Sequence, residues 1–272
     1  MNYRHAFHAG NFADCMKHAL LVWLLRALAR KPAGFRVLDT HAGIGRYDLG
    51  SSEAQRTGEW RQGIGRLQGV TEGPLADYVA LAGGGETYPG SPALAAGLLR
   101  EQDRLALVEL HEEDHATLRA LFRRDGRVAV HRRDAWEALR ALTPFPEKRG
   151  LVLMDPPFEQ PGEYERLTDA IAEVSRRARG LVQAAWYPIK GRAPVRAFHT
   201  ALAEGGVKDI VAAELHLRDP IDAARLNGCG LVVVNPPFGF EEAARTILAE
   251  LADMLSTGEA GGGWALTRIA DE

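Results

Sequence analysis

The sequence has few of the features that mark disulfide-stabilised, metal-binding or membrane proteins. Its 272 residues include two cysteines, Cys15 and Cys229, and no CxxC spacing, so we expect neither a disulfide framework nor a zinc site. The most apolar segment, residues 19–29, is interrupted by Arg26 and is too short to span a bilayer. Residues 1–10 are polar and aromatic and contain no apolar core of the signal-peptide type. We therefore expect a soluble, cytoplasmic protein.

Strong net charge is also missing. The formal charge of −3 argues against a generally basic coat, so any contact with RNA or DNA must come from a local basic face. The hydrophobic content of 46% and charged content of 25% are typical of a globular protein. The length suits one large α/β domain with an insertion, or two small domains, and no linker or repeat is visible.

The most informative stretch runs from Leu151 to Phe158, where four apolar residues precede Asp155-Pro156-Pro157-Phe158. The apolar run predicts a strand buried on both faces of a parallel sheet, and the prolines end it. Open α/β sheets bind ligands at the carboxyl ends of their strands. Asp-Pro-Pro-Phe resembles the catalytic signature of S-adenosylmethionine-dependent methyltransferases that modify exocyclic amino groups, chiefly N6 of adenine.

The chemistry fits these residue types. The lone pair of an aryl amine is delocalised into its ring, so the amine is a poor nucleophile. The carboxylate of Asp155 and a backbone carbonyl held rigid by the prolines can accept both N–H bonds and draw the nitrogen toward a tetrahedral form. The ring of Phe158 can stack on a base turned out of its helix. We therefore predict that Asp155, Pro156 and Phe158 are catalytic.

A strand followed by a proline-rich turn is the competing interpretation, because a tetrapeptide is a weak motif. The chain itself repeats the pattern at Asn235-Pro236-Pro237-Phe238. The resemblance to methyltransferases implies that the strands predicted at residues 210–217 and 231–235 form an antiparallel hairpin, as in the usual methyltransferase sheet. The second copy would then lie at the wrong edge of the sheet, so we predict that Asn235 is structural.

A glycine loop follows the first predicted strand, residues 35–39. Asp39 ends this strand and Gly43-x-Gly45 follows, but the third glycine of the dinucleotide fingerprint is replaced by Asp48. A nicotinamide dehydrogenase is therefore disfavoured, and the loop is similar to the S-adenosylmethionine loop of methyltransferases. A bare βα turn remains the simpler alternative.

Two further acids follow successive predicted strands, at residues 105–109 and 128–131. Glu109 would accept from ribose hydroxyls and Asp134 would bind the adenine amino group of the cofactor. Ser91 is predicted to cap a helix that runs to about residue 102 and to offer its hydroxyl to a carboxylate such as that of methionine. A fifth strand is expected at 181–187, closed by Pro188.

The order of these elements predicts a Rossmann-like α/β methyltransferase fold. We expect a mostly parallel sheet of seven strands, to which residues 264–269 add a short edge strand. Residues 1–45 would form a head, a helix capped at Asn11 or Asp14 and the first strand, and residues 91–272 would form the remainder of the domain. Between them, residues 46–90 would form a small helical insertion, with helical stretches at 53–67 and 74–81. The insertion contains three arginines that would face either RNA or merely solvent, namely Arg56, Arg61 and Arg66.

The N-terminal head is open to three interpretations. Its histidines His5, His8 and His18 could bind a metal, help to build a cofactor pocket, or simply pack. Asp14 and His18 lie four residues apart and would share a helix face. Trp186 and Tyr187, at the end of the fifth strand, would line a target-base pocket or pack in the core.

Taken together, these residues resemble the RlmJ family of bacterial 23S ribosomal RNA adenine-N6 methyltransferases along almost the whole chain. The distinctive blocks are residues 3–11, Ala13-Asp14, Lys17-His18, residues 38–43, 88–92 and 99–103, and Trp186-Tyr187-Pro188. The resemblance implies methylation of N6 of an adenine in 23S rRNA, with S-adenosylmethionine as donor and without a metal. It indicates no membrane association and no obligate protein partner.

The resemblance also implies residue roles. Contacts to S-adenosylmethionine would come from His18, His41, Ser91, Glu109, Asp134, Ala135 and Asp155, beside Asp39 and Gly43 of the loop. Tyr3, His5 and Lys17 would act beside the target adenine. Two positions depart from the family pattern: Phe158 replaces the common tyrosine and Ala135 the common glycine. The alternatives are N6-adenine methylation of DNA or another RNA, and an inactive nucleic-acid-binding module.

Overall fold

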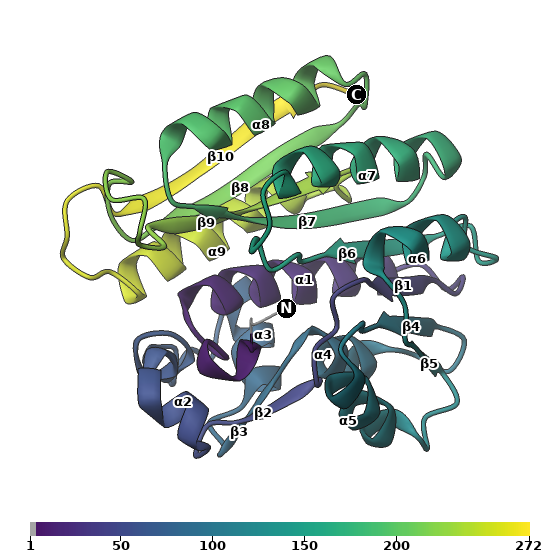
Figure 1. The fold of residues 1–272 in the computed structure, drawn as a ribbon, viewed down its shortest axis with the longest axis horizontal. Helices are drawn as coiled ribbons and strands as arrows, with labels where there is room; N and C mark the ends of the chain where they lie inside the picture. Colours follow the sequence, from purple (N-terminus) through teal and green to yellow (C-terminus); the bar gives the residue numbers. More distant parts are fainter. Residues whose placement is uncertain (1–3) are drawn as a thin grey trace.

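The computed structural model describes residues 4–272 as an eight-stranded sheet with helices on both faces and a small two-stranded ribbon beside it (Figure 1). The main sheet contains β1 (Arg36–Asp39), β4 (Arg104–Val108), β5 (Val128–His131), β6 (Gly150–Met154), β7 (Val182–Ile189), β8 (Ile210–His216), β9 (Gly228–Val234) and β10 (Gly263–Ala270). The ribbon pairs β2 (Arg46–Asp48) with β3 (Thr87–Pro89).

The strand order is β10-β8-β9-β7-β6-β1-β4-β5. The strands β5, β4, β1, β6 and β7 are mutually parallel, whereas β9 runs antiparallel to both β7 and β8. This arrangement confirms the predicted Rossmann-like fold and the predicted hairpin of β8 and β9. The eighth strand is the predicted edge strand, since β10 pairs antiparallel with β8.

Helices cover the two faces of the sheet as separate layers. One layer contributes to the larger apolar core: α1 (Phe12–Ala29), α3 (Pro74–Ala82), α4 (Ser91–Leu98), α5 (Glu112–Phe122) and α9 (Phe240–Met254). The opposite layer builds the second core: α6 (Ala135–Leu142), α7 (Glu163–Arg177) and α8 (Arg192–Glu204). Within residues 4–272, no helix combines the length and apolar character needed to cross a bilayer.

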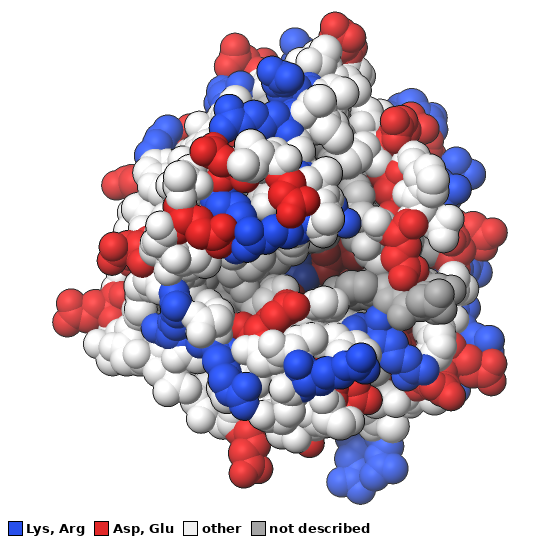
Figure 2. Space-filling model, turned by 60° about the vertical axis from the view of Figure 1, so that its left-hand side comes forward, with Lys and Arg blue, Asp and Glu red and all other residues white. Residues whose placement is uncertain are grey.

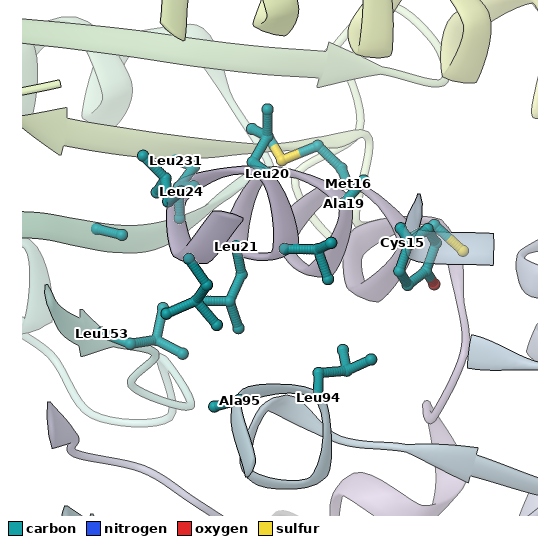
Figure 3. Packing of buried hydrophobic residues seen from close by; sticks show 14 of the residues in the cluster. Cys15, Met16, Ala19, Leu20, Leu21, Leu24, Leu94, Ala95, Leu153 and Leu231 are labelled. Carbon is teal, nitrogen blue, oxygen red and sulfur yellow. The ribbon is translucent and has the colours of Figure 1, made fainter. Parts of the chain in front are cut away.

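The helix α1 lies inside the protein rather than on its surface. Asn11 caps it as predicted, because its side chain accepts hydrogen bonds from the backbone N–H groups of Ala13 and Asp14. Apolar side chains point from α1 toward the sheet and toward α4 (Figure 3). Each fully buried leucine of this kind, such as Leu20 or Leu24, contributes roughly 1.5–3 kcal/mol. This packing fixes the polar N-terminal half of α1 relative to the sheet.

The segment between β1 and α4 contains short elements rather than one crossover helix. Between the two ribbon strands lie α2 (Ser52–Thr57), two 3₁₀ helices (Glu59–Gln62 and Ile64–Arg66) and α3. The prediction of a helix at 53–67 was therefore too simple, and the ribbon was not predicted, because three-residue strands carry too little pattern. Gly63 permits the segment to touch the head, since a Cβ there would lie 2.1 Å from the carbonyl oxygen of Gly10.

Two local predictions were wrong. The N-cap of α4 is Gly90, and Ser91 is the first helical residue; α4 also ends at Leu98 rather than near residue 102. Pro188 does not close the fifth strand but lies within β7, opposite Cys229 of β9. The neighbouring β6 has already ended at that level, so the missing N–H of Pro188 removes no ladder hydrogen bond on that side.

Candidate active site

The carboxyl ends of four adjacent parallel strands gather the acidic residues that the sequence singled out. Asp39 ends β1, Glu109 directly follows β4, Asp134 is the third residue after β5, and Asp155 directly follows β6. Because β5, β4, β1 and β6 are neighbours in the sheet, these acids lie along one edge. The structure thus brings the predicted acids together.

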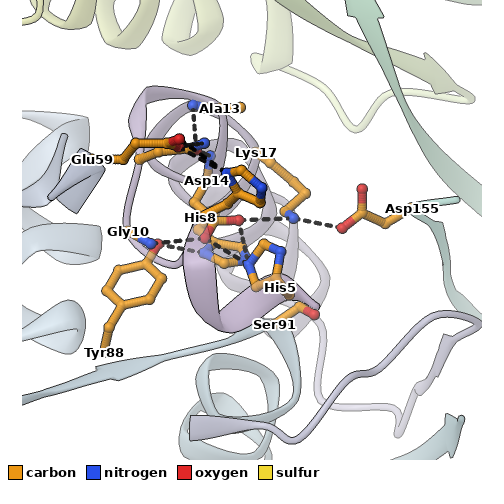
Figure 4. Close-up of polar contacts among 12 residues, drawn as sticks. His5, His8, Gly10, Ala13, Asp14, Lys17, Glu59, Tyr88, Ser91 and Asp155 are labelled. Atoms are coloured by element: carbon orange, nitrogen blue, oxygen red, sulfur yellow. Dashed lines mark hydrogen bonds and ion pairs between the residues drawn. The ribbon is translucent and has the colours of Figure 1, made fainter. Parts of the chain in front are cut away.

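The carboxylate of Asp155 is held by a lysine from α1. Lys17 Nζ donates to Asp155 Oδ2 at 2.5 Å (Figure 4). The side chain of Lys17 is 5% exposed and that of Asp155 is 18% exposed. Asp155 Oδ1 makes no hydrogen bond to any residue between 4 and 272, so one oxygen of the carboxylate is available to a ligand.

A second buried carboxylate, Asp14, organises the same cluster. Asp14 Oδ1 lies 3.0 Å from Lys17 Nζ, and Asp14 Oδ2 accepts hydrogen bonds of 2.9 Å from His5 Nε2 and from the backbone N–H of Gly10 (Figure 4). The side chain of Asp14 thus connects the head to α1 and, through Lys17, to Asp155.

The cluster is ionised despite its burial. Burial alone would raise the pKa of Asp14, but the electrostatic attraction of His5 and Lys17 and the hydrogen bond with His5 hold it well below its usual value. Burial alone would lower the pKa of Lys17, but Asp14 and Asp155 hold it well above its usual value. Lys17 is therefore a cation and cannot serve as a general base at neutral pH.

His18 lies deeper in the protein than a ligand-facing residue usually does. It is 1% exposed, and its Nδ1 lies 2.6 Å from the hydroxyl of Tyr88, which in turn lies 3.0 Å from that of Tyr78. Burial lowers the pKa of His18 to about 3, so the imidazole is neutral. A contact between His18 and the cofactor stays a prediction.

The glycine loop after β1 is fastened to the acids around it. The backbone N–H of Gly43 donates to Glu109 Oε2 at 2.9 Å, and that of His41 donates to Asp39 Oδ1 at 3.3 Å. Gly43 has a φ of +60°, and a Cβ there would lie 2.3 Å from the hydroxyl oxygen of Tyr47. Only glycine fits this turn without displacing its neighbour.

Ser91 has a different role from the predicted one. Its hydroxyl donates to Asp39 Oδ2 at 2.7 Å instead of capping α4. Burial raises the pKa of Asp39 to about 6, which the Ser91 hydrogen bond opposes and the charge of Asp155 reinforces. Ser91 therefore favours the ionised form of a buried carboxyl.

Backbone N–H groups donate hydrogen bonds to the carboxylates of Glu109 and Asp134, the acids that follow β4 and β5. Glu109 Oε1 accepts from the N–H of His111 at 2.8 Å, and burial raises the pKa of Glu109. Asp134 caps α6, its Oδ1 accepting from the N–H groups of Trp136 and Glu137. Asp134 Oδ2 has no hydrogen-bond partner among residues 4–272, which leaves an acceptor for a ligand.

His41 and Ala135 lie at the same edge of the sheet. The ring of His41 is 5.7 Å from that of Trp136, and burial lowers the pKa of His41 to about 4. Ala135 is the first residue of α6 and is buried. Both residues therefore lie at the edge that carries Asp134 and the glycine loop, and their contacts to the cofactor stay predictions.

An aromatic wall surrounds the residue that ends the Asp-Pro-Pro-Phe motif. Phe158 has a φ of +51°, and its ring centroid lies 4.8 Å from that of Tyr164 and 6.0 Å from that of Trp186. The hydroxyl of Tyr164 donates to the carbonyl oxygen of Pro188 at 2.6 Å. These contacts accompany a left-handed backbone conformation at Phe158, which is uncommon for a bulky residue.

The second Pro-Pro copy lies at the opposite edge of the sheet, as predicted. Because β9 runs antiparallel to β7, Asn235 lies at the start of β7, at the edge opposite Asp155. Its side-chain amide donates to the carbonyl oxygens of Arg179 and Leu181 at 2.7 and 2.8 Å. Phe238 is 96% exposed.

The three histidines of the head have separate partners rather than a shared one. His5 contacts Asp14, His18 contacts Tyr88, and His8 Nδ1 lies 3.0 Å from Glu59 Oε1. No group of three metal-binding side chains was found among the residues that the structure describes. Tyr3, which was predicted to lie beside the target adenine, falls outside the described residues.

Sequence reasoning missed the central position of Asp14 and the contribution of Glu59. The available signal was spacing, since Asp14 precedes Lys17 by three residues and His18 by four, so all three share a helix face. Nothing in the sequence indicated that Glu59 Oε2 also accepts from Asn11 Nδ2 at 2.9 Å. That contact joins the insertion to the cap of α1.

Comparisons with known proteins agree with this geometry. Residues 32–269 match the sequence model of the family described as "Ribosomal RNA large subunit methyltransferase D, RlmJ". The chain belongs to the RlmJ family. It is 40% identical over the full length of both chains to "Ribosomal RNA large subunit methyltransferase J" of Haemophilus influenzae. It is 38% identical to the protein of the same name from Escherichia coli, covering 97% of this chain and 98% of the relative.

A solved structure supports the fold independently. The crystal structure of a protein from Legionella pneumophila str. Philadelphia 1 superposes with a TM-score of 0.87 at 32% identity, covering 96% of this chain and 98% of the other. The resemblance inferred from the head, the glycine loop and the Asp-Pro-Pro-Phe motif is thus confirmed at the level of the RlmJ family.

Proposed function

We propose that this RlmJ-family chain methylates N6 of a specific adenine in 23S ribosomal RNA, with S-adenosylmethionine as the methyl donor. The observation that carries the proposal is the position of Asp155, at the carboxyl end of β6 and 2.5 Å from Lys17. The relatives at 38–40% identity are named as methyltransferases of large-subunit ribosomal RNA, which supports the substrate class.

The residues at the sheet edge fit S-adenosylmethionine. Glu109 would accept from the ribose hydroxyls, and the unpaired Oδ2 of Asp134 would accept from the adenine amino group. Asp39, His41 and Gly43 would hold the methionine end. Further contacts are proposed for Ser91, whose hydroxyl already binds Asp39, and for His18, Ala135 and Asp155. When bound, S-adenosylmethionine supplies an electrophilic methyl group.

Asp155 would act directly on the amine of the target adenine. Asp155 Oδ1 and a carbonyl of the Pro156-Pro157 turn would accept its two N–H bonds, which localises the lone pair on nitrogen. Lys17 holds the carboxylate in place through their ion pair, and as a permanent cation it does not compete for the proton. The surplus proton of the methylated amine would pass to Asp155 and then to water.

The substrate side of the site is proposed to consist of aromatic and head residues. Phe158 would stack on the adenine, and the ring of Tyr164 keeps it in place. His5, Lys17 and Tyr3 would lie beside the base. Stacking needs only a ring, so the absence of a tyrosine hydroxyl at position 158 leaves this role intact.

The decisive experiment is mass spectrometry of ribosomal RNA from a strain lacking this gene. We expect one N6-methyladenosine to disappear from 23S rRNA and to return with the wild-type gene but not with Asp155→Asn. An unchanged methyladenosine profile would refute the proposal.

The alternatives predict different results. A DNA methyltransferase would leave rRNA unchanged and lower N6-methyladenine in DNA instead. An inactive binding module need not bind the donor, so calorimetric titration with S-adenosylmethionine distinguishes it from an enzyme. The acceptors at Asp39, Glu109, Asp134 and Asp155 favour the enzyme.

A further inference from the structure

Positive charge is concentrated at one end of the sheet, away from the proposed chemistry. Residues 115–133, which form most of α5 and all of β5, contain six arginines and one acidic residue, Asp125, in a chain whose net charge is −3. Arg127 pairs with Asp125 at 2.7 Å. The other five arginines are exposed: Arg119, Arg123, Arg124, Arg132 and Arg133.

Four of these five arginines have no acidic partner. Arg132 forms an ion pair of 3.0 Å with Glu112. Within residues 4–272, no carboxylate lies at ion-pair distance from the remaining four, which we call the α5 basic face: Arg119, Arg123, Arg124 and Arg133. Burial and the charges of Arg133, Arg36 and His115 lower the pKa of His131, which is consistent with a positive field at this end of the sheet.

The α5 basic face borders a groove. The groove has a volume of about 410 Å³ and is lined by three arginines, three half-buried apolar residues and one acid that Arg127 already pairs: Arg119, Arg123, Arg124, Phe122, Val128, Val130 and Asp125. Its lining residues come from α5, from β5 and from the turn between them. The strand β5 is the edge strand of the sheet, and α5 lies alongside it (Figure 1). Cations around an accessible groove suit a polyanion that is wider than a single phosphate.

One sequence neighbour and one ion pair connect this face to the sheet edge that carries the candidate active site. Arg133 directly precedes Asp134, the proposed adenine-binding acid. Arg4 of the head forms an ion pair of 3.3 Å with Glu113 in the first turn of α5. The 11 residues of α5 extend about 16 Å from that contact, the length of roughly five stacked nucleotides.

Other parts of the surface are less suited to phosphates. Around the hollow on the face shown in Figure 2, basic and acidic side chains are interspersed. In the loop between β8 and β9, Arg218 and Arg225 both pair with Glu259, at 2.8 and 3.1 Å. Those guanidinium groups are already neutralised, whereas the α5 basic face is not.

We propose that the α5 basic face binds the phosphate backbone of the substrate RNA outside the target loop. The inference rests on the proposed function, because it assigns a second contact to the same substrate. Such a contact adds affinity without acting on the adenine, so its loss should affect RNA binding and leave the chemical step unchanged.

The test uses the full chain and the triple variant Arg119→Gln/Arg123→Gln/Arg124→Gln. The substrate is deproteinised 23S rRNA from a strain lacking the gene, and methyl transfer from S-adenosylmethionine gives KM and kcat. We expect KM for rRNA to rise about 10–50-fold with kcat within about twofold, and the salt slope of RNA affinity to fall by about 2, as three phosphate contacts predict. Titration with S-adenosylmethionine should match the wild type.

A control variant carries the same loss of charge elsewhere. Arg179, Arg196 and Lys208 are exposed and form no ion pair among the described residues, so Arg179→Gln/Arg196→Gln/Lys208→Gln should change KM by less than about threefold. An equal rise in KM for rRNA in the two triple variants would overturn the proposal. If the α5 triple variant fails to fold, the single variants Arg124→Gln and Arg133→Gln decide, each with an expected rise in KM of about two- to fivefold.

Two outcomes separate the possible failures. Wild-type protein that methylates no rRNA would refute the proposed function. Wild-type activity with an unaffected α5 triple variant would refute only the RNA-binding face. A variant that is normal on deproteinised rRNA but defective on ribosomal particles would also refute it, since the face would then contact a protein.

Discussion

Lys17 Nζ and Asp155 Oδ2 lie 2.5 Å apart, and this ion pair joins the buried helix α1 to the end of the central strand β6. The residues are separated by 138 positions in the sequence. The same lysine contacts Asp14, which also binds the head through His5 and the backbone of Gly10. The carboxylate proposed to act on the adenine is therefore positioned by the N-terminal part of the chain.

The first prediction concerns Asp155 itself. Asp155→Asn keeps the size of the side chain but removes the negative charge that accepts from the amine, so we expect methyl transfer to fall by about 10²–10⁴. Affinity for S-adenosylmethionine should change by less than about tenfold. Single-turnover methylation of rRNA measures the first quantity and calorimetry the second.

The matched control is the second Pro-Pro copy. Asn235→Ala removes two hydrogen bonds to backbone carbonyls and should cost about 1–2 kcal/mol of unfolding free energy. Its kcat should stay within about twofold of the wild type. A large loss of kcat in a folded Asn235→Ala protein would mean that the wrong copy has been assigned to catalysis.

The second prediction concerns the buried charges. Lys17→Met leaves Asp14 buried beside a neutral side chain, and breaking a buried pair in this way costs about 3–5 kcal/mol. The double variant Lys17→Met/Asp14→Asn should recover part of that loss, because the uncompensated charge is gone. Urea unfolding of wild type, the single variants Lys17→Met and Asp14→Asn, and the double variant measures the coupling, and purely additive losses would show that the ion pair contributes nothing to stability.

The third prediction concerns the insertion. Glu59 accepts from His8 and from Asn11, whose other side-chain atom caps α1 (Figure 4). Glu59→Gln should loosen the head and lower kcat for rRNA about tenfold, since small displacements at a reacting centre are costly. Affinity for S-adenosylmethionine should be unchanged.

Glu53→Gln is the control for Glu59. Glu53 lies on α2 in the same segment and accepts only from the neighbouring Ser52 hydroxyl among the described residues. We expect wild-type kcat from this variant. If Glu59→Gln and Glu53→Gln lower kcat equally, the cause is the loss of negative charge from the insertion and not the loss of the contact between Glu59 and the head.

The fourth prediction concerns pH. Burial raises the pKa of Asp39 to about 6, above its usual value of 3.8, so the folded protein binds this proton more tightly than the unfolded chain does. Between pH 4 and 6 the contribution of Asp39 to stability therefore falls as pH rises, by on the order of 3 kcal/mol in total.

The comparison of wild type with Asp39→Asn isolates this contribution. The asparagine variant should gain stability relative to wild type as pH increases from 4 to 6 and show a constant difference above pH 7. Unfolding curves at half-unit pH steps measure it. A difference that is independent of pH would show that the pKa of Asp39 is the same in the folded and unfolded states.

Much of this protein could be predicted from local sequence patterns. The apolar runs gave the strands of the parallel sheet, and Asn11 gave the start of α1, because these features depend on neighbouring residues. The acids at the strand ends could be placed at one edge because parallel strands share a direction. The local errors were at Ser91 and Pro188, where a tertiary contact or the end of a neighbouring strand outweighed the local preference.

Only the tertiary structure decided how distant segments meet. The antiparallel direction of β9 puts Asn235 at the opposite edge from Asp155, although the two motifs look alike in sequence. The contacts between Lys17 and Asp155 and between Glu59 and Asn11 depend on how α1 and the insertion pack against the sheet. The sequence by itself determined the strands, the family and the acids available for chemistry. Long-range packing determined which residues are brought together in the site. The sequence alone does not specify these pairs, because burial energy is shared among many residues.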